Sequence, residues 1–540
     1  MEELITLWTA LLIVVTLVTY LAQRIALAEP VLLVLAGLVI SLVPHVPHVI
    51  LSPELVLNVV LPLLIYTGAV VVPWHDFRRN LRPIGILSIG LVGFTTCGVA
   101  LLAHFLIPGM SWAPALVLGA VISPPDDVAV AIVTRRLSIP RRLLVVLEGE
   151  GLVNDVTALT IFRFALIAAA GGTVSMWTIS LSFLATLAGG ILYGLLVGWL
   201  ALKLRQKMHD TQLEITVSLI TPFVAYLVPE HFGVTGILST VAAGVFISAQ
   251  SPKGISPQTR LEAHQLWVII SFWMNNMLFL VLGLQLKSVT AEVADIALSQ
   301  LAVYGALFTA LVIALRFIWV YAAAYLSRWL SPSLRKTDPI PPSRHLFLVA
   351  YSGMRGAISM AAVLSIPLTS PNGQEFPHRN LIVFVTFFVI LATLVGQGLL
   401  LPLVVRKLCI GEDGDREQQQ DSLGELRARI AASEAGIARL HTLEREGVFP
   451  REIIEALLRE RESYGREVAF HLGGQRDAEL RKIALMGLEA RKIEISAERE
   501  KLLEMLRGGE INEYVLIRIE HDLDLRAARL EDYALSLANP

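Results

Sequence analysis

Two carboxylates in an apolar stretch are the residues best suited to bind a cation or a proton. Glu148 and Asp155 stand at the two ends of the stretch Glu148-Gly-Glu-Gly-Leu-Val-Asn-Asp155. At about 100° per residue they are only about 20° apart around a helix, so they share one face. Loss of water favours the protonated form of a carboxylate, so a proton and a monovalent cation can compete for Asp155. Glu148 would lie roughly 10 Å closer to the cytoplasm, where it attracts cations toward the site.

A second group lies where two prolines interrupt an apolar run, Val121-Ile-Ser-Pro-Pro-Asp-Asp-Val128. Each proline removes a backbone donor, so this run cannot continue as one helix. Irregular backbone at membrane depth lines cavities, and broken helices mark the binding sites of transporters. Asp126 is therefore a candidate ligand, and the oxygens around Ser123 can add to it. The alternative role for Asp126 or Asp127 is to cap the second half-helix.

These two groups predict one cation site. The expected ion-binding residues are Asp155 and Asp126 as carboxylate ligands, Ser123 as a neutral oxygen ligand, and Asn154 to orient a water or Asp126. If Asp155 must be protonated or cation-bound before the protein changes conformation, the empty charged form is trapped. The proton and cation gradients would then be coupled.

The elements that position these residues are membrane helices. Hydrophobic residues make up 55% of the 540 residues and charged residues 17%, far from the average soluble composition. A helix needs roughly 20 apolar residues to cross hydrocarbon about 30 Å thick. We predict an all-α polytopic membrane protein with about thirteen transmembrane helices. The predicted spans are residues 4–22, 30–43, 51–72, 84–107, 113–133, 143–168, 180–202, 212–228, 234–250, 265–286, 296–327, 345–367 and 380–404. The first opens with Glu2 and Glu3, so we expect a retained helix and not a signal peptide.

Charges between the spans predict the orientation, because cytoplasmic loops collect lysine and arginine. The odd-numbered loops hold 17 such residues, and the even-numbered loops hold only Lys287 and Arg379. This alternation places the N-terminus outside and the C-terminus inside an inner or plasma membrane. Twelve spans would result if the short second span is re-entrant.

Charged residues at membrane depth are few, and each needs a partner or a function because it costs about 2.5–3.5 kcal/mol on insertion scales. They are Asp126, Asp127, Glu148, Glu150, Asp155, Arg163, Arg316 and Arg355. Arg355 lies between two glycines in Ser352-Gly-Met-Arg-Gly-Ala357, which loosens the twelfth span as the prolines break the fifth. Spans seven apart run in opposite directions, as in an inverted repeat of spans one to six with eight to thirteen, whose broken helices meet near the midplane.

Glu150 lies about 140° from Asp155 around the same helix, away from the cation face. A buried carboxylate in that position needs a counter-charge. Arg355 is the predicted partner in a structural ion pair, because its span must pack nearby if the repeat holds. Arg316 is the competing candidate.

Three motifs resemble those of sodium/proton exchangers in the monovalent cation:proton antiporter family. Leu147-Glu-Gly-Glu-Gly-Leu-Val-Asn-Asp-Val-Thr-Ala-Leu159 resembles their E-G-E-S-L-N-D-A-T-A-L helix. Ser123-Pro-Pro-Asp126 resembles their broken helix, and Gly353-Met-Arg-Gly-Ala-Ile-Ser359 resembles G-[LM]-R-G-A-V-S. Similarity extends to residues 78–83 and 272–284, so it covers essentially residues 1–405.

The resemblance implies exchange of a monovalent cation, above all Na⁺, for protons by alternating access. It also implies a homodimer with a dimerisation half and a six-helix core with crossed broken helices. The family aspartates matching Asp155 and Asp126 bind the ion. Asn154 stands where electrogenic relatives carry a second aspartate, which implies electroneutral exchange. The family residues matching Glu150 and Arg355 form a structural ion pair.

Two departures from the family pattern affect the choice of cation. Gly151 replaces the family's usual serine, and Tyr66 lies where many relatives have a carboxylate on the third span. Both positions can supply oxygen ligands in relatives. The selection of Na⁺ over K⁺ or Li⁺ therefore stays open, and K⁺/H⁺ antiport is the alternative function.

Other classes of protein fit less well. An intramembrane aspartyl protease also needs two buried aspartates, but Gly149-Glu-Gly151 is not followed by the aspartate of its Gly-x-Gly-Asp motif. An ion-sensing receptor or channel is a further alternative. Cys97 and Cys409 lie far apart, so we expect no disulfide or zinc site. We expect no enzyme activity, no cofactor beyond the transported ions and no nucleic-acid partner.

The composition changes to dense mixed charge at about Gly411. We predict a transmembrane antiporter domain over residues 1–405, a hinge at Gly411–Asp415 and a cytoplasmic helical tail over residues 411–540. Apolar residues spaced by three and four indicate about four amphipathic helices in the tail. The predicted breaks are Gly447 with Pro450, Gly473-Gly474 and Gly508-Gly509. The tail could be a small bundle or dimerisation arm, or it could bind a regulatory ligand or protein.

Overall fold

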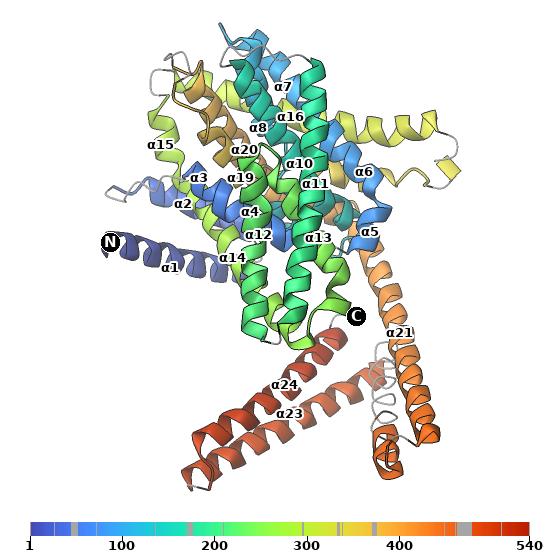
Figure 1. The fold of residues 1–540 in the computed structure, drawn as a ribbon. Helices are drawn as coiled ribbons and strands as arrows, with labels where there is room; N and C mark the ends of the chain where they lie inside the picture. The colour runs from blue at the N-terminus through green and yellow to red at the C-terminus, as the bar shows by residue number, and fades with distance from the viewer. Residues whose placement is uncertain are drawn as a thin grey trace. The chain divides into compact units, whose positions relative to one another are not determined.

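The computed structural model of the chain consists of helices (Figure 1). It describes residues 2–25, 27–44, 52–71, 73–134, 137–169, 176–208, 210–293, 296–331, 335–336, 338–369, 375–447, 449–459, 461, 478–508 and 510–538. Within these ranges the only strand-like pairing is an isolated bridge between Thr369 and Glu375. The chain divides into two compact units, Met1–Gly414 and Asp415–Pro540.

The first unit carries the predicted spans. Its helices are α1 (Glu2–Ile25), α2 (Glu29–Ser41), α3 (Pro53–Leu55), η1 (Val56–Val60), α4 (Leu61–Val71), α5 (Trp74–Arg79), α6 (Leu81–Gly85), η2 (Ile86–Leu91), α7 (Val92–Leu106), α8 (Trp112–Ile122), α9 (Asp127–Thr134), α10 (Arg141–Ala169), α11 (Met176–Lys207), α12 (Thr211–His231), α13 (Gly236–Gly254), α14 (Pro257–Leu284), α15 (Leu286–Ala291), α16 (Leu298–Leu330), α18 (Ser343–Tyr351), α19 (Ala357–Leu364) and α20 (Arg379–Lys407). Nine helical stretches among the described residues are long and apolar enough to cross a membrane, and three shorter helices are also apolar. The all-α polytopic fold is therefore confirmed, and the number of thirteen crossings stays a prediction.

Polar residues in the loops set where several helices begin. Ser52 accepts a hydrogen bond from the backbone N–H of Leu55, and Asp210 accepts one from Leu213 at the start of α12. Such caps satisfy backbone donors that have no partner within the helix.

The helices of the membrane unit pack as two sets. In the first set α10 lies against α8, α9 and η2, while α16, α18, α19 and α20 pack on one another and on α7 and α8. In the second set α12 lies against α11, α13, α14 and α4, and α2 packs on α14. α11 and α13 run side by side in this second set (Figure 1). The broken helices belong to the first set, so the candidate site lies along its border with the second.

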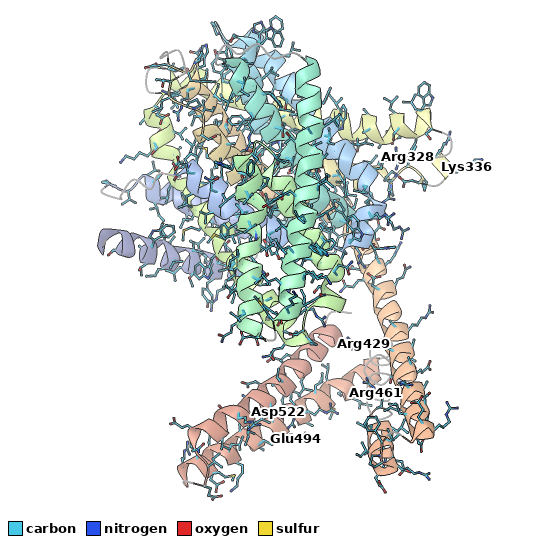
Figure 2. All side chains as sticks on the ribbon, in the orientation of Figure 1. Arg328, Lys336, Arg429, Arg461, Glu494 and Asp522 are labelled. Carbon is cyan, nitrogen blue, oxygen red and sulfur yellow. The ribbon has the colours of Figure 1, made fainter. Side chains whose placement is uncertain are left out.

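The tail helices are α21 (Ile410–Glu446), α23 (Ala478–Arg507) and α24 (Glu513–Ala538). α23 and α24, on which Figure 2 labels Glu494 and Asp522, pair through three buried leucines and Ile495. Charged contacts such as Arg526 with Glu494 at 3.7 Å add to this pairing. The predicted break at Gly447 is confirmed, because α21 ends at Glu446 and Gly447 has a φ of 66°. α23 ends just before Gly508, and the predicted break at residues 473–474 lies outside the described residues.

The predicted hinge at residues 411–415 is wrong, because α21 is helical through this segment. The chain turns slightly earlier, at Cys409, whose φ is 51°. Glu412 and Asp413 lie in the first turn of α21, where negative charge is stabilised by the helix dipole. This contribution offsets the low helix propensity of the two glycines in the segment.

Asp338, in the connection between α16 and α18, holds arginines from three helices. Its carboxylate accepts hydrogen bonds from Arg142 and Arg328, each at 2.8 Å, and Arg82 lies 3.8 Å away. Partial burial acts to raise the pKa of Asp338. The hydrogen bond and charge of Arg142, with the charges of Arg328 and Arg82, nevertheless hold this pKa below its usual value.

Asp338 should therefore stabilise the fold in a pH-dependent way. A carboxylate with a lowered folded pKa contributes stability above its unfolded pKa of about 3.9, and the contribution is lost as pH falls through the folded value. We expect Asp338→Asn to lower the melting temperature of the detergent-solubilised protein at neutral pH. The difference from the unmodified protein should shrink below about pH 4, and a constant difference down to that range would contradict this role.

Candidate ion-binding site

The two predicted breaks meet inside the membrane unit. Residues 123–126 separate α8 from α9, and residues 352–356 separate α18 from α19. The backbone N–H of Asp126 donates a hydrogen bond to the carbonyl of Met354 at 2.7 Å. A Cβ added to Gly356 would lie 1.3 Å from Oδ2 of Asp126, so the backbone and the carboxylate are in close contact. The prediction of two broken helices that meet is confirmed.

Two buried arginines donate hydrogen bonds to carbonyls at the ends of α8 and α18, the first halves of the two broken helices. The last carbonyls of a helix have no donor within the helix. At the end of α8, Arg355 donates from Nε to the carbonyl of Ile122 at 3.1 Å and from Nη2 to that of Ser123 at 3.5 Å. At the end of α18, Arg316 donates from Nε and Nη2 to the carbonyl of Val349 at 3.2 and 3.0 Å. A cation at a helix C-terminus also stabilises the negative end of the helix dipole.

Glu150 pairs with Arg316. The Nη1 and Nη2 groups of Arg316 donate to the two carboxylate oxygens at 2.6 and 2.9 Å, and both side chains are 1% exposed. The predicted Glu150–Arg355 pair is therefore wrong, and the competing candidate is the partner. Arg355 lies within the unwound segment, where the freed carbonyls of α8 take its donors. Gly353 makes room for Arg316, since a Cβ there would lie 2.4 Å from the Arg316 Cδ.

Asn154 ties α10 to the unwound segment between α8 and α9. Its Nδ2 donates to the carbonyl of Pro125 at 2.8 Å, and its Oδ1 is buried without a hydrogen-bond partner among the described residues. Since Asp155 follows Asn154 and Asp126 follows Pro125, this bond brings both aspartates to one region. Oδ1 of Asp126 also accepts from the backbone N–H of Ala129 at 3.1 Å, so Asp126 caps α9.

Ser123 lies buried at the end of α8, next to this crossing. Its hydroxyl donates to the carbonyl of Ala120 at 3.0 Å, so the proton is directed back onto the helix. The hydroxyl oxygen keeps its lone pairs as acceptors.

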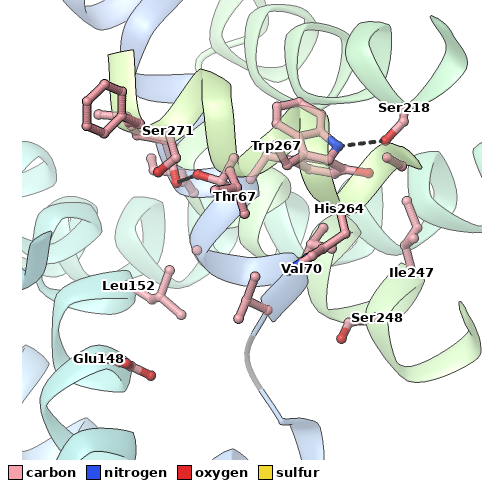
Figure 3. Close-up of a pocket in the computed structure, with 18 of the residues that line it drawn as sticks. Thr67, Val70, Glu148, Leu152, Ser218, Ile247, Ser248, His264, Trp267 and Ser271 are labelled. Carbon is pink, nitrogen blue, oxygen red and sulfur yellow. Dashed lines mark hydrogen bonds between the residues drawn. The ribbon is translucent and has the colours of Figure 1, made fainter. Parts of the chain in front are cut away.

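A cavity of ≈ 1170 Å³ reaches Asp155. Glu148, Gly151 and Asp155 of α10 line one side of it. Glu148 and Leu152 lie across this cavity from side chains of α4 and α14 in Figure 3. Glu150 is turned away and bonded to Arg316. The prediction that Glu148 and Asp155 share a face and that Glu150 lies on another is confirmed.

The opposite wall carries neutral oxygens, of which the sequence analysis pointed only to Tyr66. Tyr66, Thr67, Ser271, Asn275 and Asn276 all line the cavity. The Oδ1 of Asn276 is buried and has no hydrogen-bond partner in the described part of the chain. The sequence signal for Asn275 and Asn276 is two adjacent amides inside an otherwise apolar span.

Comparison with known proteins decides the family. The model of the transmembrane region of sodium/hydrogen exchangers matches residues 11–407. The chain is a member of the sodium/hydrogen exchanger family. As an exchanger it is a monovalent cation/proton antiporter and not an enzyme.

Full-length relatives and a solved fold agree with this family. A protein of Mycobacterium tuberculosis named as an uncharacterized Na⁺/H⁺ exchanger is 34% identical over 533 residues, covering 97% of this chain and 96% of that protein. The sodium, potassium, lithium and rubidium/H⁺ antiporter of Bacillus pumilus is 30% identical over 511 residues, covering 92% and 74%. The sodium proton antiporter of Methanocaldococcus jannaschii has a similar fold, with a TM-score of 0.60 and 16% identity over 76% of this chain and 98% of that chain.

The close contact between the Gly356 backbone and the Asp126 carboxylate should be required for ion exchange. We expect Gly356→Ala to displace the Asp126 carboxylate and to lower the exchange rate by about 10²-fold, as misplacement of reacting groups by about 1 Å does in enzymes. Gly396→Ala in α20 is the matched control, because a Cβ there meets nothing within 4 Å. Exchange rates in vesicles, normalised to protein amount, would be compared. Equal rates in both variants would rule out this requirement.

Proposed function

We propose that the protein exchanges Na⁺ for H⁺ electroneutrally by alternating access, with Asp155 carrying either ion. The observation that supports this most is the position of Asp155, which lines the cavity on α10 directly after the asparagine that holds the unwound segment. Asp155 is 9% exposed. A carboxylate with so little exposed surface is stabilised when a proton or a bound cation neutralises its charge.

The groups around Asp155 can complete a sodium site. Asp126 would add a carboxylate oxygen, and Ser123 a hydroxyl oxygen. The unsatisfied Oδ1 of Asn154 would bind the cation or hold a water beside it. If Asp126 keeps its charge as the cap of α9 in both loaded forms, only Asp155 changes its occupant. One Na⁺ then replaces one proton, and no net charge moves.

Other charged groups would have supporting roles. Glu150 is neutralised by Arg316 within the first set of helices, so it would not take part in the exchange. Glu148 lines the same cavity as Asp155 and lies roughly 10 Å from it along α10. It would attract cations into the cavity without binding the transported ion.

The second candidate function is K⁺/H⁺ antiport. Tyr66 and Gly151 both line the cavity, so neither departure from the family pattern is remote from the ion path. The wall that Tyr66 belongs to offers hydroxyl and amide oxygens in place of a further carboxylate. The Bacillus pumilus relative carries a name that includes potassium.

The protein would lie in the cell membrane as a homodimer with its tail in the cytoplasm. Arg205 and Arg260 line the cavity, and both belong to predicted cytoplasmic loops. The cavity would therefore open to the cytoplasm.

Cation-induced proton movement tests this function. Inside-out vesicles from cells that lack their own antiporters would be acidified by respiration, with acridine orange as the pH probe. Addition of NaCl should restore fluorescence, and KCl and LiCl added separately decide the cation. Fluorescence that stays quenched with all three salts would refute the function.

The tail would tune exchange through its first turn. Asp413 accepts a hydrogen bond from Arg344 at 2.8 Å and pairs with His345 at 2.9 Å. Both partners lie at the start of α18, the half-helix that leads to the crossing. This contact gives the beginning of the tail a direct connection to the broken helix.

Removal of the residues after Gly411 should leave exchange intact but shift its dependence on pH or on cation concentration. Asp413→Ala in the full chain should reproduce the shift, because it frees Arg344 and His345. Glu412→Ala is the matched control, since it removes a charge from the same turn of α21. Vesicle assays over a range of pH give the comparison. A truncated protein that folds, reaches the membrane and transports nothing would exclude a merely regulatory tail.

A further inference from the structure

We propose that Arg163 and Glu230 form a gate that closes the ion site on the side away from the cavity mouth. This inference rests on the proposed exchange at Asp155. Arg163 lies on α10 and Glu230 on α12, and Nη2 of the arginine pairs with Oε2 of the glutamate. Arg163 is a charged residue in the predicted sixth span, and it has no role in the proposed ion site.

The pair joins the two sets of helices. α10 packs with α8, α9 and η2, which carry or support the broken segments, whereas α12 packs with α11, α13 and α14. The cavity lies between these sets, since α10 lines one side and α4, α13 and α14 line the other. A contact between α10 and α12 therefore bridges elements that must separate if the site is to open on its other side.

A packed apolar seam lies between Asp155 and this ion pair. Val156 and Leu159 of α10 belong to one hydrophobic cluster with Tyr226 of α12 and Ile237 of α13. The described residues that line the cavity include Asp155 but none of these four. The cavity thus ends at the level of Asp155, and the seam closes the path beyond it.

The geometry at Glu230 suits a contact that breaks and reforms. Its Oε1 accepts a hydrogen bond from the backbone N–H of Gly236 at 2.9 Å, which fixes the carboxylate at the start of α13 and directs Oε2 to Arg163. The side chain of Arg163 is 47% exposed and that of Glu230 is 19% exposed, so the pair lies at the edge of the packed helices. Opening it would not leave a fully buried charge without a partner, which is the costly case, so exchange could open this pair in every cycle.

Tyr226 connects the gate with the ion site. It is buried on α12, one helical turn before Glu230, and it belongs to the same hydrophobic cluster as Val156, which directly follows Asp155 on α10. Opening of the Arg163–Glu230 pair, followed by separation at Tyr226, would expose Asp155 to the second side of the membrane.

Reversible cross-linking tests the gate. Arg163→Cys and Glu230→Cys would be combined in a chain whose native thiols are removed by Cys97→Ser and Cys409→Ser. A bifunctional methanethiosulfonate with a spacer as long as the two replaced side chains should bridge the cysteines. Exchange should then fall to background and return after reduction, while each single-cysteine variant stays active. Exchange at an unchanged rate with the pair fully bridged would overturn the proposal.

A second measurement does not depend on the activity of the double variant. Leu159→Cys, in the same thiol-free chain, reports access to the seam from the side where α10 ends. Glu230→Gln removes the charge but keeps an oxygen acceptor for the Gly236 N–H. It should increase labelling of Leu159→Cys by a membrane-impermeant thiol reagent severalfold, and unchanged labelling would contradict the gate. Asp155→Asn, measured in parallel, tests the ion site alone, so failure of the gate and failure of the exchange site can be distinguished.

Discussion

Replacement of Arg316 by methionine should destabilise the protein by about 3–5 kcal/mol, because removal of one partner of a buried ion pair leaves the other charge uncompensated. Glu150 would lose both of its hydrogen bonds from the guanidinium, and the carbonyl of Val349 at the end of α18 would lose its donor. We expect low yield from the membrane and a lower melting temperature in detergent.

Two further variants make this result specific. Glu150→Gln combined with Arg316→Met should recover part of the stability, because it removes the unpaired charge. Arg355→Met should cost less than Arg316→Met, since it leaves carbonyls of α8 without a donor but no carboxylate without a counter-charge. Unsatisfied buried acceptors cost about 1–3 kcal/mol each. Unchanged melting temperatures in Glu150→Gln and Arg316→Met would show that the pair does not stabilise the fold.

Asp155→Asn should abolish proton-coupled cation exchange without loss of protein. The amide keeps the size of the side chain but can be neither deprotonated nor charged, so it cannot alternate between a proton and a cation. Folding should survive, because Asn154 still holds Pro125 and Glu150 still pairs with Arg316. Initial rates in inside-out vesicles, normalised to protein amount, measure the effect.

Glu148→Gln is the matched variant on the same face of α10. It removes one carboxylate charge from the same cavity but leaves Asp155 in place, so exchange should continue with a lower apparent affinity for the cation. If Glu148→Gln instead lost its maximal rate and Asp155→Asn kept full activity, the roles assigned to the two carboxylates would have to be reversed.

Helical periodicity was sufficient to separate the faces of α10. The spacing of Glu148 and Asp155 predicted their shared cavity, and the angle to Glu150 predicted its different environment, because both follow from the geometry of a single helix. The helix break at Pro124 could also be predicted from the sequence, because proline removes a backbone donor at its own position.

The identity of the Glu150 partner depends on tertiary structure. The sequence favoured Arg355 over Arg316, but the choice between them rests on the space at Gly353 and on the carbonyls that α8 leaves free. The partner of Arg163 could not be predicted for the same reason, because the Arg163–Glu230 pair joins two helices, α10 and α12, whose relative position depends on tertiary structure.

The hinge predicted at residues 411–415 is absent because contacts around this segment override its local propensity. Two glycines in a charged segment indicate flexibility, but the acidic first turn of α21 and the contacts of Asp413 with Arg344 and His345 favour a helix there.

The most direct test of the account is the number of protons released when Na⁺ binds. Purified protein would be titrated with NaCl by calorimetry in two buffers of different ionisation enthalpy, with choline chloride as the control for ionic strength. If both ions compete for Asp155, binding should release close to one proton per Na⁺ in the pH range where the site is protonated. The apparent Kd should then rise about tenfold for each unit of decreasing pH, and Asp155→Asn should show neither effect. Na⁺ binding that releases no protons, with a Kd independent of pH, would contradict the shared site.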